Sequence, residues 1–134
     1  MKVLIGITGS IAIYKTCELI RLFIKMGDEV KVVMSESAAK FITPLTFEAL
    51  TRNKVLIEKN EDWSSELNHI DYAKWADIYI IAPATANTIN KAANGIADNL
   101  LLQTYLATKA PVLFAPAANT NMYLHPTTQS SFKK

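Results

Sequence analysis

The chain has 134 residues, a length that suits one domain with a core of its own. Half of the residues are apolar, 19% are charged and the formal net charge is +2, which argues against a nucleic-acid groove or a polybasic membrane arm. The single cysteine, Cys17, excludes an internal disulfide, and no Cys/His spacing suits a zinc site, so no metal is expected.

Targeting and membrane signals are not evident in the sequence. The apolar run near the N-terminus is too short for a signal peptide and lacks a cleavage pattern. No segment approaches the roughly 18 to 20 uninterrupted apolar residues of a transmembrane helix. We therefore expect a cytoplasmic protein.

The first part of the chain predicts a strand, a helix and a second strand. Val3–Ile7 is an apolar run typical of a buried strand. Apolar residues then recur at helical spacing from about 11 to 26, and Gly27 suits the end of that helix. Val30–Met34 is a second buried run, so these elements form a βαβ unit.

Shorter elements are expected through the rest of the chain. Ser35 suits the cap of a short helix that ends at Lys40. The remaining elements are expected, in chain order, as a helix over 43–50, a strand over 54–58, a polar loop over 60–66, a helix around 67–75, a strand over 77–82, a helix over 86–93, a helix over 98–108 capped by Asp98, a strand over 111–115 and a first helical turn at 127–129. The alternation predicts one α/β domain over residues 1–134 with about five parallel strands.

Two loops of similar chemistry follow two of the predicted strands. Ala82–Thr88 follows one apolar run and Ala115–Asn119 follows another. Ligands of open α/β sheets bind outside the carboxyl ends of the strands, so we expect these two loops to form one site. Their Asn and Thr side chains and backbone N–H groups suit a ligand rich in oxygen and nitrogen acceptors.

The first strand-to-helix junction, Gly6–Ala12, contains two glycines and two hydroxyls. Glycine lets backbone N–H groups approach a phosphate, and a helix N-terminus adds free donors and a positive dipole. The spacing matches neither G-x-G-x-x-G nor a Walker lysine motif, so a single phosphate fits better than a pyrophosphate. A tight turn capped by Ser10 explains the same residues equally well. Ser35 and Ser37 are expected beside this loop, as ligands or as caps.

Four features, in this order along the chain, resemble the homo-oligomeric flavin-containing cysteine decarboxylases, in particular the phosphopantothenoylcysteine decarboxylases. The features are Gly9–Ala12 followed by Tyr14 and Lys15; His69 ahead of Ala76 and Asp77; Pro83–Thr88 with Gly95–Leu101 downstream; and Pro116–Asn119 with Met122 and Pro126. Each motif alone is weak. Together and in this order they are specific, and the resemblance spans nearly the whole chain.

The resemblance implies an α/β fold of the Rossmann-like or flavodoxin-like kind, with three layers and a parallel sheet flanked by helices. It implies non-covalent binding of FMN and assembly as a homo-oligomer, a trimer or a dodecamer built from trimers, with active sites between subunits. The implied reaction decarboxylates 4′-phosphopantothenoylcysteine to 4′-phosphopantetheine in coenzyme A biosynthesis. The flavin takes two electrons from the cysteinyl unit and returns them after CO2 has left.

The resemblance also implies roles for residues by position. His69 matches the family's essential histidine, a candidate base because imidazole titrates near neutral pH. Asn119 matches a second catalytic residue, the asparagine that binds the substrate carboxylate. The cofactor-binding residues implied are Gly9, Ser10, Ile11 and Ser35 at the phosphate end, and Thr85, Ala86, Asn87 and Thr88 at the flavin or ribityl part. Without the resemblance, His69 would read as a surface or capping residue and Asn119 as a turn residue.

Two departures from the family pattern lead to an alternative hypothesis. Ala118 stands where the family usually has methionine, which predicts a looser pocket. The family's substrate-covering segment, with its own cysteine, lies beyond this loop, and Cys17 is expected to be structural. The chain is therefore expected to be truncated at Lys134, and the alternative is an FMN-binding module without decarboxylase activity. A flavin-free α/β domain is a third reading, and Glu61 and Asp62 are expected to be solvated.

Overall fold

The computed structural model describes residues 1–116. The expectations for Ala118, Asn119, the helical turn at 127–129 and the end of the chain at Lys134 lie outside the described residues. The described elements are β1 (Lys2–Ile7), α1 (Ile13–Lys25), β2 (Glu29–Met34), a short 3-10 helix (Ala38–Lys40), α2 (Pro44–Thr51), α3 (His69–Trp75), β3 (Ile78–Ala84), α4 (Ala86–Ala93), α5 (Leu100–Ala107) and β4 (Val112–Pro116).

The strands form one parallel sheet in the order β2-β1-β3-β4. Val3 of β1 pairs with Val30 on one side and with Ile78 on the other. The chain thus winds from β1 to one neighbour, then returns past β1 to build the other half of the sheet. The reversal puts a topological switch point at the carboxyl ends of β1 and β3, the place where ligands of open α/β sheets bind.

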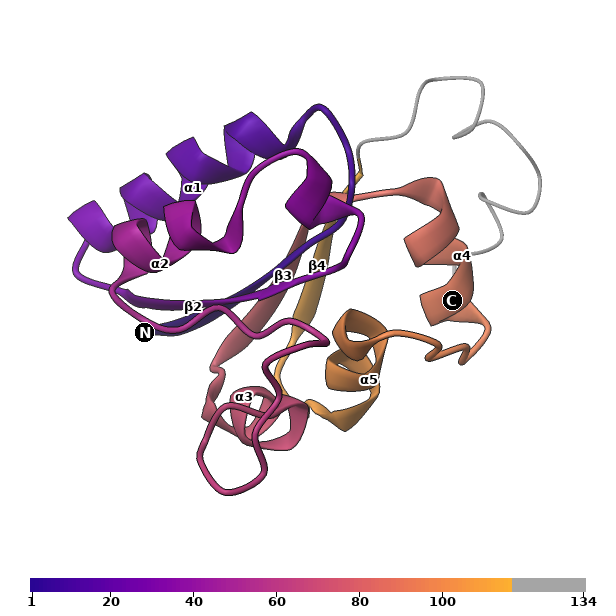
Figure 1. Ribbon diagram of the computed structural model, residues 1–134. Helices are drawn as coiled ribbons and strands as arrows, with labels where there is room; N and C mark the ends of the chain where they lie inside the picture. Colours follow the sequence, from indigo (N-terminus) through magenta and orange to yellow (C-terminus); the bar gives the residue numbers. More distant parts are fainter. Residues whose placement is uncertain (117–134) are drawn as a thin grey trace.

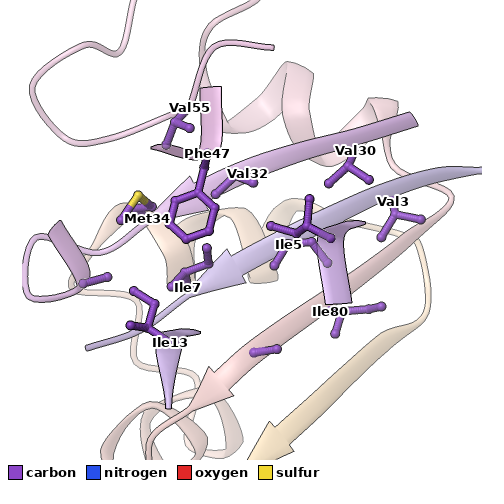
Figure 2. Packing of buried hydrophobic residues seen from close by; sticks show 13 residues of the cluster. Val3, Ile5, Ile7, Ile13, Val30, Val32, Met34, Phe47, Val55 and Ile80 are labelled. Carbon is purple, nitrogen blue, oxygen red and sulfur yellow. The ribbon is translucent and has the colours of Figure 1, made fainter. Parts of the chain in front are cut away.

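Helices cover both faces of the sheet, which makes three layers (Figure 1). Helices α1 and α2 pack on one face, while α3, α4 and α5 pack on the other. Figure 2 shows the first of these cores, where Val3, Ile5 and Ile7 of β1 meet Phe47 of α2. Leu4, between them, belongs to the opposite core, because successive strand residues point to opposite faces. The flavodoxin-like α/β fold is confirmed.

The ends of α1 follow the chemistry of its flanking residues. Gly27 has φ +89°, its N–H donates to the carbonyl of Ile24 at 3.0 Å, and the N–H of Asp28 donates to the carbonyl of Phe23 at 3.0 Å. This pair of bonds is the Schellman motif that a glycine after a helix predicts. Cys17, on this helix, packs against the core, and burial raises the pKa of its thiol, as befits a structural cysteine.

The strand expected over 54–58 is reduced to a single bridge, between Leu56 and Val33 of β2. The carbonyl of Val30 accepts a hydrogen bond from the side-chain amide of Asn53 at 2.8 Å, where a longer strand would supply a backbone N–H. The side chain therefore ends the pairing on the N-terminal side of Leu56. The prediction of about five strands is wrong for the described part of the chain, which has four.

The cap of α5 also differs from the expectation. Asn99, not Asp98, accepts a hydrogen bond from the N–H of Leu102, at 2.9 Å, from a backbone with φ −144° and ψ 169°. An N-cap needs this extended conformation so that its side chain can reach the first turn. The carboxylate of Asp98 instead accepts a hydrogen bond from Lys91 Nζ at 2.8 Å. No helix of the described part has the length and apolar character needed to cross a membrane.

Candidate functional site

Thr8 joins the carboxyl ends of β1 and β3. Its hydroxyl donates to the carbonyl of Pro83, and its own N–H reaches the same oxygen at 3.3 Å. The N–H of Thr85 donates to Thr8 Oγ1 at 3.2 Å. Thr8 is only 3% exposed, so these bonds form away from water. The switch point is therefore a fixed junction of two loops rather than two independent turns.

The end of β4 adjoins the same junction, and most of the loop expected to share the site lies outside the described residues. Ala84 of β3 pairs with Pro116 of β4, after a register shift that begins beyond Ile81. β3 runs two residues further than expected, so Pro83 lies within the strand rather than in the loop. Asn119, the expected substrate ligand, lies outside the described residues.

The loops that follow β1 and β2 lie against each other. A Cβ built on Gly9 would lie 2.6 Å from Ser37 Oγ and 2.8 Å from Ser37 Cβ, so only glycine fits there. Ser35 Oγ lies 3.1 Å from Ser37 Oγ and accepts a hydrogen bond from the N–H of Ala38 at 3.2 Å. The placement of Ser35 and Ser37 beside the Gly9 loop is as expected. Ser35 therefore stabilises the turn before the short 3-10 helix, whose N-cap residue is Ser37.

The N-terminus of α1 presents donors suited to an anion. The N–H groups of Gly9, Ser10 and Ile11 have no hydrogen-bond acceptor within residues 1–116. Ser10 Oγ accepts a hydrogen bond from the N–H of Ala12 at 3.1 Å, and no acidic residue occupies the first turn of the helix. Helix α1 has 13 residues, and the positive end of its dipole points at this loop. The donor set fits the phosphate of a mononucleotide.

The N-terminus of α4 offers a second, smaller set of donors. Thr85 caps the helix, since its hydroxyl accepts a hydrogen bond from the N–H of Thr88 at 3.2 Å, and the two hydroxyls lie 3.0 Å apart. The side chains of Ala86 and Thr88 are buried, whereas that of Asn87 is exposed. Of the four residues expected at the flavin, Asn87 can therefore offer its side chain, while Ala86 can offer only its backbone N–H.

A cavity of about 160 Å³ lies between α1 and the ends of β3 and β4. Its lining includes Lys15, Thr16, Pro83 and Pro116. Thr16 is held in place, because its hydroxyl donates to the carbonyl of Ala82 at 2.8 Å. Pockets for small ligands measure roughly 300–1,000 Å³. The cavity is smaller than that range, and its lining includes none of the residues expected to bind the cofactor.

His69 is the first residue of α3, and it does not belong to either of the donor sets just described. Glu61 Oε2 lies 2.7 Å from His69 Nδ1 and accepts a hydrogen bond from His69 N at 3.0 Å. The indole of Trp63 meets the imidazole edge-to-face, with ring centroids 5.2 Å apart. In Figure 1, α3 lies at the starting end of β3 and α4 follows the other end. Within residues 1–116, no side chain from the loops after β1 or β3 makes a hydrogen bond, ion pair or ring contact with His69.

Glu61 was missed at the sequence level. It was expected to be solvated, but its side chain is only 20% exposed and is paired with His69. The roles of Thr8 and Thr16 were missed as well. A hydroxyl directly after a buried strand is a usable signal for Thr8, whereas no spacing rule links Glu61 to a residue eight positions away.

We expect Thr8→Val to weaken both the fold and the anion site. Valine keeps the shape but leaves the N–H of Thr85 without its acceptor, which costs about 1 kcal/mol. If that junction holds the loops of the flavin site that the resemblance implies, flavin affinity should fall about fivefold with it. Urea unfolding and flavin titration measure the two effects.

Thr104→Val is the matched control for Thr8→Val. Thr104 is fully buried in α5, and its hydroxyl donates to the carbonyl of Leu100 at 2.8 Å, away from the junction. This variant should lose stability and keep its flavin affinity. Equal affinity losses in both variants would mean that the Thr8 bonds have no special part in the site.

Comparisons with known proteins agree on one family. A family model described as Flavoprotein matches residues 1–134. The chain is 52% identical over 126 residues to the Bacillus subtilis protein named coenzyme A biosynthesis bifunctional protein CoaBC, covering 93% of this chain and 31% of that protein. It is 44% identical over 133 residues to a Streptococcus mutans protein named probable phosphopantothenoylcysteine decarboxylase, covering 97% of this chain and 74% of that protein.

The fold comparison gives the same result. The solved structure of the FMN-dependent cysteine decarboxylase TvaF, from thioviridamide biosynthesis, matches with a TM-score of 0.90 and 27% identity, over 99% of this chain and 83% of that chain. The chain spans about a third of the Bacillus subtilis relative, at 31% of its length. The similarity therefore concerns one domain of that bifunctional protein.

Proposed function

The chain belongs to the Flavoprotein family, and from this premise we propose that it is an FMN-dependent decarboxylase of coenzyme A biosynthesis. The proposed reaction converts 4′-phosphopantothenoylcysteine to 4′-phosphopantetheine in the cytoplasm. The names of the Bacillus subtilis and Streptococcus mutans relatives support the substrate class. The observation that carries the proposal is the cluster of backbone donors at the β1–β3 switch point, which suits the phosphate of a flavin mononucleotide.

The residues that would hold FMN are those at the two helix N-termini. The N–H groups of Gly9, Ser10 and Ile11 would donate to the phosphate, with Ser35 alongside. The four-residue turn from Thr85 to Thr88 would face the flavin or ribityl part, through the exposed side chain of Asn87 and the backbone N–H groups. When bound, FMN would supply an acceptor and donor of two electrons.

The protein's own side chains would bind the substrate and move protons. His69 would act as the base, because a neutral imidazole can take up a proton at physiological pH. Asn119 would hold the substrate carboxylate through its side-chain amide. Both assignments rest on the family likeness and on the chemistry of the two side chains.

We further propose that the active site forms between copies of this chain, as a trimer or a dodecamer built from trimers. Within the described part of one chain, the side-chain hydrogen bond and the ring contact of His69 go to the loop that contains Glu61 and Trp63, and neither goes to a proposed flavin donor. A histidine so placed could meet the substrate at the flavin of another copy. Light scattering after size-exclusion chromatography measures the assembly.

Absorbance and product analysis together test the proposed function. The purified protein should show a flavin spectrum and release FMN at about one per chain on denaturation. Incubation with 4′-phosphopantothenoylcysteine should release CO2 and give a product lighter by that mass. A protein that binds FMN without turnover would support the alternative, a binding module of the same family. A protein that takes up no FMN would overturn both.

A further inference from the structure

The side chain of Glu61 makes two bonds to one residue. Its Oε2 accepts a hydrogen bond from the backbone N–H of His69 at 3.0 Å and lies 2.7 Å from the imidazole Nδ1. Both side chains are largely shielded, at 18% exposure for His69 and 20% for Glu61. A contact this short and this shielded differs from the exposed ion pairs that contribute little.

The loop that carries Glu61 is held by its own hydrogen bonds. Asp62 Oδ1 accepts from the N–H and the hydroxyl of Ser64, at 2.9 and 2.6 Å, and these bonds lower the pKa of Asp62. The N–H of Asp62 donates to the carbonyl of Leu67 at 2.7 Å. The loop is therefore closed on itself directly beside Glu61, which limits the positions that the carboxylate can take.

The helix that carries His69 is fixed at the same point. Asn68 caps α3, since its side chain accepts a hydrogen bond from the N–H of Asp71 at 2.8 Å and is 2% exposed. The indole of Trp63 meets the His69 ring edge-to-face at an interplanar angle of 85°. The imidazole is thus bounded by a carboxylate, an aromatic ring and a capped helix start.

We propose that Glu61 is a positioning residue that fixes the tautomer and orientation of His69. The catalytic part of this inference rests on the proposed function, whereas the tautomer is inferred from the geometry alone. An ionised carboxylate only accepts hydrogen bonds, so its partner nitrogen, Nδ1, must carry the proton. Nε2, on the other side of the ring, then keeps its lone pair free.

The arrangement suits a base that acts through Nε2. When Nε2 takes a proton from a substrate group, that group is left with the electron pair and the imidazole becomes a cation. The negative charge of Glu61, 2.7 Å from Nδ1, stabilises the cation where it forms. Glu61 touches neither substrate nor flavin in this scheme, and it works only through His69.

The tautomer of His69 can be measured by ¹⁵N NMR on the purified protein. The chain has two histidines, and the signals that disappear in His69→Gln belong to His69. In the neutral form, we expect Nδ1 to carry the proton and Nε2 to show the shift of an unprotonated nitrogen. Glu61→Gln should retain the Nδ1–H form, because the amide oxygen can still accept. Glu61→Leu should lose it.

The turnover of the same variants tests the catalytic meaning. Glu61→Leu should lower kcat by about tenfold to a hundredfold, by analogy with the loss on removing the carboxylate partner of a metal-bound histidine. Its KM should change less than twofold, and Glu61→Gln should restore part of the rate. Glu66→Gln removes an exposed carboxylate from the same loop and should match the wild type in both measurements.

An Nε2–H tautomer in the wild-type protein would overturn the inference, whether or not Glu61→Leu folds. A tautomer that Glu61→Leu leaves unchanged would overturn it too. The spectrum is independent of turnover, so it separates the two proposals. An Nδ1–H form in a protein without decarboxylase activity would support the positioning of His69 by Glu61 and reject the proposed function.

Discussion

Replacement of His69 by glutamine is expected to lower turnover by about 10²- to 10⁴-fold, the usual contribution of a general acid or base. Glutamine has a similar reach and keeps the backbone bond to Glu61, but it cannot take up a proton near neutral pH. The flavin content should stay at the wild-type level, because within residues 1–116 no proposed flavin donor makes a hydrogen bond, ion pair or ring contact with His69. Single-turnover assays on flavin-loaded protein measure the loss.

The control for this variant is Lys74→Gln. Lys74 is exposed on the same helix, so its replacement tests whether any change on α3 slows the reaction. Turnover of His69→Gln within tenfold of the wild-type value would show that His69 is not the base. Loss of flavin together with turnover would instead place the histidine at the cofactor.

Mixing two inactive variants tests whether the site is shared between copies. Gly9→Asp places a Cβ 2.6 Å from Ser37 Oγ and a negative charge at the proposed phosphate site, so this variant should bind no FMN. Its chains still supply His69, whereas His69→Gln chains still supply the flavin. Co-folded mixtures should regain activity that neither variant has. A mixture as inactive as its components would argue for sites built within one chain.

Gly6→Ala is expected to destabilise the fold by about 1–3 kcal/mol through overpacking. The added Cβ would lie 2.7 Å from the hydroxyl oxygen of Tyr79 and 3.0 Å from its Cε1. Tyr79 is fully buried, and its hydroxyl donates to the carbonyl of Leu101 at 3.0 Å, so the ring cannot move without loss of that bond. The same burial raises the pKa of Tyr79 far above its usual value.

A double-mutant cycle with Tyr79→Phe checks the cause. Phenylalanine removes the oxygen nearest to the new methyl group, so the double variant should lose less than the sum of the two single losses. Urea unfolding at fixed temperature gives the four free energies of unfolding. Additive losses would mean that Gly6 is required for some reason other than its contact with Tyr79.

The success of the fold prediction depended on local patterns. Each apolar run between Val3 and Phe114 that pairs for several residues was identified, because a strand of a parallel sheet is apolar along most of its length. Gly27 marked the end of α1 for an equally local reason, since a positive φ favours glycine. The four ordered motifs likewise pointed to the family that the comparisons confirm.

The errors arose where a distant or competing partner decided the outcome. The pairing of Leu56 stopped because Asn53 reached the carbonyl of Val30, a choice that propensity does not predict. Asp98 and Asn99 are both good caps, and the backbone conformation selected the second. In both cases the sequence offered a suitable residue, and the three-dimensional arrangement determined which one was used.

The sequence by itself determined most of the elements, their order and the donor chemistry of the loops, because those follow from periodicity and from residues adjacent in the chain. Only the tertiary structure decided that Thr8 joins Pro83, 75 residues away, and that Glu61 meets His69. Such bonds depend on the order of strands in the sheet and on the path of a closed loop. Neither the strand order nor the loop path produces a regular spacing in the sequence. The partners of the site residues are therefore visible only in the folded chain.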